Sequence, residues 1–221
     1  MTELSRSDLP RWVELREQQH AAVVQAILAL VSEGSTQLKV ADLAERAGMS
    51  RPTFYKYFPT VGAAMLHTER VLLGAMEQFV AQTRSPDKNA REQLLERFEL
   101  TFEYTCAHPE VVRFFTFFDF TFERFGLAES ERTEQLRISS KAGNPLYELF
   151  CDGQADGSID PTLPRDITYL SLISSLVGIR QRLCVEAEWT NGVDQTAREA
   201  HSTLVNVWRQ ALLPPPPNPH P

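Results

Sequence analysis

The sequence predicts an all-α protein, with a small N-terminal group of helices and a larger C-terminal helical part. Apolar residues recur three and four positions apart along most of the chain, which is the spacing of an amphipathic helix. No run of alternating apolar and polar residues is long enough to predict a strand. The chain has 221 residues, 43% of them hydrophobic, which is enough for one large domain or for a small and a medium one.

The first expected helix follows an N-terminal arm of residues 1–12, which is predicted to be flexible. This helix runs from about residue 13 to Glu33, and Gly34 ends it. Its apolar stripe consists of Val24, Ile27, Leu28 and Val31. The stripe gives the helix one face to bury in a core.

Residues 39–58 predict two short helices joined by a tight turn. The first helix has its apolar face at Val40, Leu43, Ala44 and Ala47. Gly48 then suits the left-handed backbone that often ends a helix, and Ser50 offers its hydroxyl as an N-cap for the next helix. Pro52 falls in the first turn of that second helix, where its missing N–H group costs nothing.

The second of these helices has one apolar face and one face suited to nucleic acid. Phe54 and Phe58 are four residues apart, so both turn toward the preceding helix. The other face carries cations, hydroxyls and a proline: Arg51, Pro52, Thr53, Tyr55, Lys56 and Tyr57. Cations and hydroxyls on an exposed helix suit contacts with phosphates and base edges, which favours double-stranded DNA as a partner.

The run A-E-R-A-G-M-S-R-P-T-F-Y-K-Y-F, residues 44–58, resembles the helix-turn-helix of the TetR family of bacterial transcriptional regulators. The family pattern is matched at Leu43, Ala44, Ala47, Gly48, Met49, Ser50, Thr53, Tyr55, Tyr57 and Phe58. The resemblance implies a three-helix DNA-binding domain at the N-terminus. It also implies operator contacts by the outward face of the second helix and by Ser50.

The sequence departs from that family pattern at two places. Val61-Gly62 stands where many members carry Lys-Glu, whose Lys touches phosphate. Leu38-Lys39 stands where a Thr or Ser commonly caps the first helix of the motif. Lys39 is expected to supply a phosphate contact in compensation, so it joins the predicted DNA-binding residues.

The rest of the chain predicts a series of longer helices. Their expected ranges are 60–83, 89–107, 109–126, about 130–151, 164–185 and 195–213. Thr60 is the expected cap of the first, Pro109 opens the third, and Gly126 ends it. Residues 152–159, D-G-Q-A-D-G-S-I, predict a turn, and residues 214–221, P-P-P-P-N-P-H-P, predict a flexible polyproline-like tail.

Phenylalanines are concentrated between residues 98 and 125, on two of these expected helices. Rings at neighbouring positions point to several sides of one helix, more than one core interface normally uses. Two interpretations remain open, a helix buried on most sides or the wall of an apolar cavity. Together with the TetR resemblance, the cluster favours a cavity for a small apolar or aromatic effector, lined by Phe102, Tyr104, Phe114, Phe117, Phe118, Tyr147 and Arg180.

The last two expected helices carry apolar stripes and small residues that suit close helix packing. The TetR resemblance implies that these helices form a four-helix interface in a homodimer. The interface residues expected on that basis are Leu172, Ser175, Leu176, Ile179, Leu204, Val205 and Trp208. Packing inside one subunit explains the same pattern, and that alternative stays open.

Charge and composition exclude several classes of function. Net charge is −7, but the first 60 residues contain as many bases as acids, and residues 46–68 contain no acid, so the local field favours phosphate. The histidines and cysteines lack the spacing of a metal site, and no catalytic motif is present, so we expect no enzyme, cofactor or metal. No segment suits a membrane span or a signal sequence, which predicts a cytoplasmic protein.

We therefore expect a TetR-type DNA-binding domain at residues 13–60, an effector-binding and dimerisation domain at 61–213, and flexible tails at 1–12 and 214–221. The expected function is a ligand-responsive transcriptional regulator, most simply a repressor that an effector releases from its operator. The alternative is a helical effector-binding or interaction protein whose DNA-binding motif has degenerated.

Overall fold

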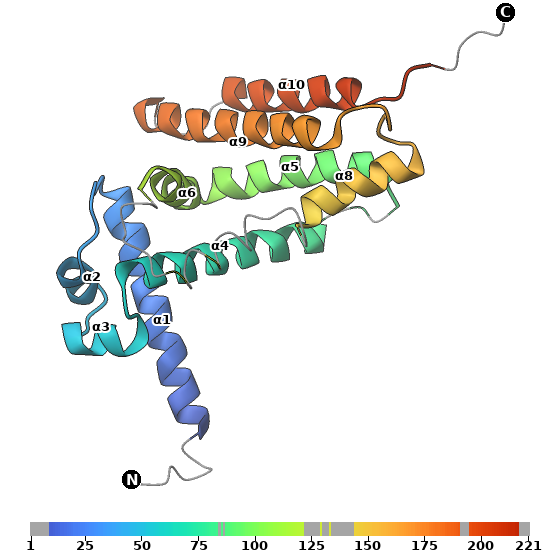
Figure 1. Ribbon diagram of the computed structural model, residues 1–221. Helices are drawn as coiled ribbons and strands as arrows, with labels where there is room; N and C mark the ends of the chain where they lie inside the picture. Colours follow the sequence, from blue (N-terminus) through green and yellow to red (C-terminus); the bar gives the residue numbers. More distant parts are fainter. Residues whose placement is uncertain are drawn as a thin grey trace, which may run out of the picture. The chain divides into compact units, whose positions relative to one another are not determined.

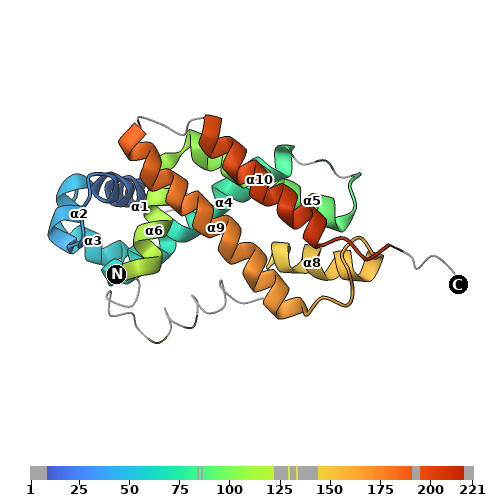
Figure 2. The same ribbon diagram turned by 90° about the horizontal axis from the view of Figure 1, so that it is seen from above.

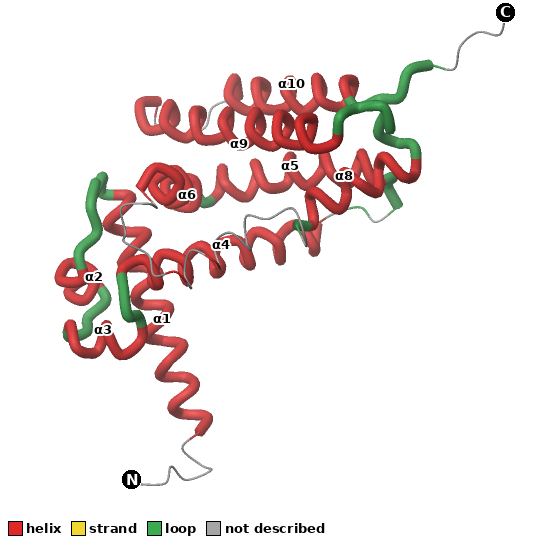
Figure 3. The backbone as a smooth tube through the Cα atoms, viewed as in Figure 1, coloured by secondary structure: helices red, strands yellow, loops and turns green. Residues whose placement is uncertain are grey.

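The computed structural model describes residues 9–83, 85, 87–121, 129, 133, 144–190 and 195–216. Within these ranges every element is a helix and none is a strand, which confirms the predicted all-α class (Figure 3). In chain order (Figure 1) the helices are α1 (Leu9–Ser32), α2 (Val40–Arg46), α3 (Arg51–Tyr57), α4 (Val61–Thr83), α5 (Ala90–Ala107), α6 (Pro109–Thr121), α8 (Pro145–Asp156), α9 (Arg165–Thr190) and α10 (Gln195–Ala211).

The chain divides into two compact units. The first unit comprises Met1–Leu73 and Arg113–Gln135, and the second comprises Gly74–Val112 and Leu136–Pro221. Helices α4 and α6 each contribute residues to both units. A continuous helix therefore carries the backbone from the first unit into the second at residues 73–74.

In the first unit, α1 packs against α2 and α3, and these two short helices pack against each other. The predicted apolar stripe of α1 is buried, at Val24, Ile27, Leu28 and Val31. Leu43 of α2 and Phe54 of α3 are fully buried. The apolar spacing thus predicted the inward face of each helix correctly, because burial of apolar surface decides which face turns in.

Helix α1 begins at Leu9, about one turn earlier than the sequence analysis expected. Pro10, interpreted there as part of a flexible arm, lies in the first turn of the helix instead. An amide at that position has no intrahelical acceptor, so the missing N–H group of proline breaks no hydrogen bond. At the other end Gly34 has a φ of +83°, as expected of the residue that ends this helix.

In the second unit, α5 packs against α8 and α10, while α9 packs against both α8 and α10. Helices α9 and α10 run antiparallel side by side (Figures 1 and 2). The core of this unit is a cluster of ten buried residues: Leu94, Leu95, Phe98, Phe150, Ile159, Tyr169, Leu172, Leu176, Val205 and Leu212. Each of α5, α8, α9 and α10 contributes side chains to it.

The turn expected at residues 152–159 begins later than predicted, because α8 continues to Asp156. Gly153 lies inside that helix, where an added Cβ would stand 2.6 Å from Cδ1 of Ile159. The Ile159 amide also donates to the Gly153 carbonyl at 2.8 Å. Gly153 therefore provides close packing, and Gly157, with a φ of +76°, makes the turn.

Several predictions lie partly or wholly outside the described residues. These are residues 1–8 of the N-terminal arm, the helix end at Gly126, most of the helix expected near 130–151, and residues 217–221 of the tail. The described part of that later helix is α8, which Asn144 caps by accepting from the Leu146 amide at 3.0 Å. The other expected helices match α4, α5, α6, α9 and α10, with α9 continuing to Thr190 rather than residue 185.

Candidate functional site

The turn between α2 and α3 has the geometry that the sequence predicted. Gly48 has a φ of +66°, a backbone conformation that other residues adopt only with strain. Ser50 caps α3, because its Oγ accepts a hydrogen bond from the Thr53 amide at 3.2 Å. Pro52 lies in the first turn. These local features fix the point and direction at which α3 begins.

Helix α3 separates buried from exposed side chains sharply. Phe54 is fully buried, Phe58 at the helix end is nearly so, and their ring centroids lie 5.7 Å apart. The predicted DNA-contacting residues all keep some exposure: Ser50, Arg51, Pro52, Tyr55 and Lys56 are exposed, and Thr53 and Tyr57 are half-buried. One face anchors the helix to the rest of the unit, and the opposite face is presented to solvent.

Lys39 occupies the N-cap position of α2 and is exposed. Its backbone is extended, and its side chain makes no capping hydrogen bond. A Ser or Thr at this position would satisfy one of the first amides of the helix, which a lysine ammonium cannot do because it has no acceptor. Lys39 thus places a positive charge at the start of α2 but does not cap the helix.

Arg46 lies in the acid-free segment but adds little to its positive charge. Its guanidinium donates to both carboxylate oxygens of Glu33, at 2.7 and 2.6 Å. That hydrogen-bonded pairing holds the pKa of Glu33 below its usual value. Because the Arg46–Glu33 pair is neutral, the net positive charge of residues 46–58 comes from Arg51 and Lys56.

Aromatic and histidine rings pack together where α3 ends. His20 of α1 lies with its ring centroid 5.7 Å from that of Tyr57 and 5.0 Å from that of Phe58. His67 of α4 lies 4.7 Å from His20 and 5.5 Å from Phe58. Burial lowers the pKa of both histidines, which favours the neutral rings that such packing needs. The spacing of these residues in the sequence does not predict this cluster.

The predicted effector-binding residues are distributed over both units. Phe114, Phe117 and Phe118 belong to the first unit, and Phe102, Tyr104, Tyr147 and Arg180 belong to the second. In the first unit, Phe114 and Phe118 are buried and stack at 5.6 Å. The structure thus brings together two of these three phenylalanines, which accords with either a core or a cavity wall.

In the second unit, Phe102 stacks on the buried ring of His201, with centroids 3.9 Å apart. Burial and then the nearby charge of Arg180 lower the pKa of His201 to about 4. Phe102 and Arg180 are therefore both close to one neutral histidine. Tyr104 instead packs against Phe79, at 5.4 Å between centroids.

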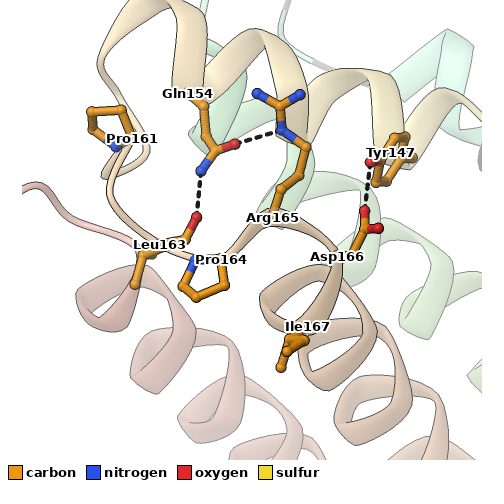
Figure 4. Close-up of a pocket in the computed structure, with 8 residues that line it drawn as sticks. All are labelled: Tyr147, Gln154, Pro161, Leu163, Pro164, Arg165, Asp166 and Ile167. Atoms are coloured by element: carbon orange, nitrogen blue, oxygen red, sulfur yellow. Dashed lines mark hydrogen bonds between the residues drawn. The ribbon is translucent and has the colours of Figure 1, made fainter.

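A pocket of about 540 Å³ opens on the second unit near the start of α9 (Figure 4). Its lining consists of Tyr147, Gln154, Pro161, Leu163, Pro164, Arg165, Asp166 and Ile167. The Tyr147 hydroxyl donates to Asp166 Oδ1 at 2.8 Å, and Arg165 Nε donates to Gln154 Oε1 at 2.7 Å. This open pocket has mutually paired polar groups, and among the predicted effector residues it contains Tyr147 alone.

The residues predicted for a dimer interface lie largely inside the second unit. Leu172, Leu176 and Val205 belong to its core, and Trp208 Nε1 donates to the Ser175 hydroxyl at 2.8 Å. Ile179 and Leu204 are half-buried. The exposed side of α9 carries other residues, namely Ile167, Leu170, Ser171, Ser174 and Gly178, and α10 adds Val207.

Neither a metal-binding cluster nor a membrane-spanning helix is found in the part of the chain that the structure describes. No group of three or more His, Cys, Asp or Glu side chains there could hold a metal ion. No helix there has both the length and the hydropathy to cross a membrane.

Comparison with known families identifies the region around the turn. Residues 23–60 match the family model described as "Bacterial regulatory proteins, tetR family". This range starts within α1, includes α2 and α3, and ends at Thr60, the residue that caps α4 by accepting from the Ala63 amide at 2.9 Å. No curated protein matches the sequence.

The fold is shared with solved structures over most of the chain. A TetR family transcription regulator from Marinobacter aquaeolei VT8 is 17% identical with a TM-score of 0.65, over 91% of this chain and 99% of that one. A TetR-family transcriptional regulator from a Rhodococcus species is 18% identical with a TM-score of 0.66, over 86% and 98%. A fatty acid degradation regulator from Bacillus halodurans is 19% identical with a TM-score of 0.59, over 86% and 97%.

Proposed function

This chain belongs to the TetR family of bacterial regulatory proteins, and on that premise we propose that it is a transcriptional repressor that leaves its operator when a small effector binds. One observation carries the proposal. Helix α3 buries Phe54 completely while Arg51, Tyr55 and Lys56 remain exposed on its other side. A helix anchored in this way can enter the major groove as a rigid body.

Each predicted contact residue receives a role from its chemistry. Arg51 and Thr53, near the start of α3, are proposed as base readers, since the N-terminal residues of a recognition helix reach the base edges. Lys39, Lys56 and Tyr57 are proposed as phosphate contacts. The remaining proposed contacts, which fit the helix against the groove, are Ser50, Pro52 and Tyr55.

We propose a dimer because of the geometry that operator recognition requires. Two recognition helices must lie about 34 Å apart, or a multiple of that distance, to enter successive major grooves. We place the interface on the exposed side of α9 and on α10. Among the residues predicted for it, Ser175, Ile179, Leu204 and Trp208 keep some exposure. Leu172, Leu176 and Val205 are instead buried in the core of their own subunit. Exposed Ile167 and Leu170, at 71% and 61%, support α9 as the contact surface, and Ser174 and Gly178 leave room for a second helix.

The effector is proposed to be small and apolar or aromatic. The residues proposed to contact it are Phe102, Tyr104, Tyr147 and Arg180 in the second unit and, separately, Phe114, Phe117 and Phe118 in the first. The high content of phenylalanine in α5 and α6 supports an apolar ligand, and a protein of the same fold is named as a regulator of fatty acid degradation. Helix α4 contributes to both units, so a shift of this helix on effector binding would move the DNA-binding unit.

In this account residues 13–60 form the DNA-binding domain and residues 61–213 form the effector-binding and dimerisation domain of a non-enzymatic, cytoplasmic protein. The departure at Val61-Gly62 supports one alternative, a helical effector-binding or interaction protein that no longer binds DNA. The two functions differ in a measurable property. A working regulator with several phosphate contacts binds DNA with a steep dependence on salt, and the alternative does not.

The proposal is tested by titrating the full chain against DNA from around its own gene, at about 50 and about 200 mM salt. We expect specific binding with two protomers per site and a loss of affinity of at least about a hundredfold between these two concentrations. Arg51→Ala should change the preferred sequence, while Lys56→Ala should weaken binding equally on all sequences. Weak binding that ignores sequence in the unsubstituted protein would refute the proposed function and favour the alternative.

A further inference from the structure

One face of α1 extends the surface that α3 presents. Trp12, Arg16 and His20 are spaced four residues apart, so they lie along the same side of the helix over about 12 Å. Trp12 is 46% exposed and Arg16 is exposed, while His20 is half-buried. Helix α1 packs against α3 within the first unit (Figure 1), so this face borders the recognition helix.

Two ring contacts join this face to the end of α3. The ammonium nitrogen of Lys56 lies 5.3 Å from the centroid of the Trp12 ring and 5.8 Å from that of Tyr57. His20 meets the Tyr57 ring edge to face, at 5.7 Å between centroids. The two proposed phosphate contacts at the end of α3 therefore both rest on side chains of α1.

The charged groups that shift the pKa values of His20 and His67 are all basic. Burial lowers the pKa of His20 most, and the charge of Arg16 lowers it further. Burial likewise lowers the pKa of His67, and the charges of His20, Arg70 and Arg16 add to this shift. No carboxylate contributes to either shift. Within the described residues, Arg16 forms no ion pair, which leaves its charge uncompensated.

The acids of α1 lie on its other side. At 100° per residue, Glu14 is about 160° and Glu17 about 100° from the centre of the Trp12–Arg16–His20 face. The same positive surroundings disfavour a metal cation between His20 and His67, although their ring centroids are only 4.7 Å apart. An anion is the ligand that this surface fits.

We propose that the Trp12–Arg16–His20 face of α1 is part of the DNA interface, with Arg16 in contact with a backbone phosphate and Trp12 as a positioning residue for Lys56. The inference rests on the proposed function, since it takes the exposed face of α3 as the surface that meets DNA. It adds a contact outside the helix-turn-helix and assigns a role to the indole ring.

The role of Trp12 follows from the flexibility of lysine. A free lysine side chain loses rotamer entropy when its ammonium is held at a phosphate. The indole ring of Trp12 restricts Lys56 before DNA binds, so less entropy is lost on binding. The contact with the ring does not remove the charge of the Lys56 ammonium or occupy its N–H donors. A phosphate oxygen can therefore still accept a hydrogen bond from this ammonium.

The Arg16 contact is tested by the salt dependence of operator binding by the full chain. Arg16→Gln should weaken binding about threefold to tenfold and reduce the slope of log K against log salt by about 0.9, the value for one lost phosphate contact. Arg16→Lys should retain the slope. The control is Glu14→Gln, which changes the charge by one unit in the opposite direction on the other side of α1 and should leave the slope unchanged. A wild-type slope in Arg16→Gln would overturn the contact.

The positioning role is tested by a double-substitution cycle with Lys56. Trp12→Ala should weaken binding about twofold to fivefold without a change of slope, and Trp12→Phe should restore much of the loss. In the Lys56→Ala background, Trp12→Ala should have no further effect, whereas an equal loss in both backgrounds would overturn the role. Val13→Ala, at the neighbouring exposed position, is the control. Absence of specific, salt-dependent binding by the unsubstituted protein would instead refute the proposed function, so the two failures are distinguishable.

Discussion

Helices α3 and α9 both carry residues that the sequence assigned to a partner, but the structure places these residues differently. On the seven-residue α3, Arg51, Tyr55 and Lys56 are exposed as expected. On the 26-residue α9, Leu172 and Leu176 were predicted for a dimer interface and lie in the core of their own unit.

The difference comes from how the apolar residues are distributed around each helix. A short helix with Phe54 as its single fully buried residue has one inward side, so the outward side follows from spacing alone. Helix α9 packs against α8 and α10, and its apolar residues are distributed around the helix. Spacing cannot say which of several apolar faces meets the subunit's own helices, because that depends on contacts distant in sequence.

The strongest test of this contrast on α3 compares two adjacent residues. Phe54→Ala removes a fully buried ring and should lower the free energy of unfolding by about 3–5 kcal/mol. Tyr55→Ala removes a ring that is 54% exposed and should change it by less than about 0.5 kcal/mol while weakening operator binding. Denaturant unfolding and DNA titration measure the two effects. Similar destabilisation by both substitutions would contradict the assignment of faces.

A second pair of variants makes the same comparison on α9. Leu172→Ala should cost about 2–5 kcal/mol of unfolding free energy, because Leu172 is fully buried. Leu170→Asp, at a residue that is 61% exposed, should leave the subunit folded but shift the protein from dimer to monomer. Sedimentation with circular dichroism separates these results. A folded Leu170→Asp dimer would show that the interface lies elsewhere.

Substitutions at two glycines should change the free energy of unfolding in opposite directions, and by less than the core substitutions. Gly153→Ala should lower the free energy of unfolding by about 1–3 kcal/mol, because its Cβ would meet Ile159. Gly74→Ala, in a helical position with nothing within 4 Å of the added Cβ, should raise it by about 0.5–1 kcal/mol. Chemical denaturation measures both. Stabilisation of equal size at the two positions would mean that helix propensity, rather than close packing, governs Gly153.

The smallest expected effect is a pH dependence of stability at His201. Its pKa is about 4 in the folded chain and about 6.5 when unfolded, so the unfolded state takes up the proton first as pH falls. The stabilisation that comes from keeping His201 neutral is therefore fully present above pH 6.5 and is lost progressively as the pH falls toward 4. Between pH 7 and 5, the Tm of the wild type should fall by about 2–4 °C more than that of His201→Phe, which keeps a ring against Phe102. Identical pH profiles would exclude this histidine as the cause.

Features set by local chemistry were predictable from the sequence, and features set by distant contacts were not. The Ser50 cap, the left-handed Gly48 and the burial of Phe54 each depend on residues within one turn, and each was predicted. The role of Gly153 depends on Ile159 folding back over α8, so the sequence pattern placed Gly153 in a turn instead. Trp12 was assigned to a flexible arm because nothing local shows that Lys56 lies beside it.

The central claim is that α3 of each subunit in a dimer reads DNA through its exposed face. Hydroxyl-radical footprinting of the full chain on its operator tests it most directly. We expect two protected half-sites with centres about 10 base pairs apart, or a multiple of that spacing, and a loss of both in Arg51→Ala at the same protein concentration. A single protected segment, or protection that survives Arg51→Ala unchanged, would contradict the account.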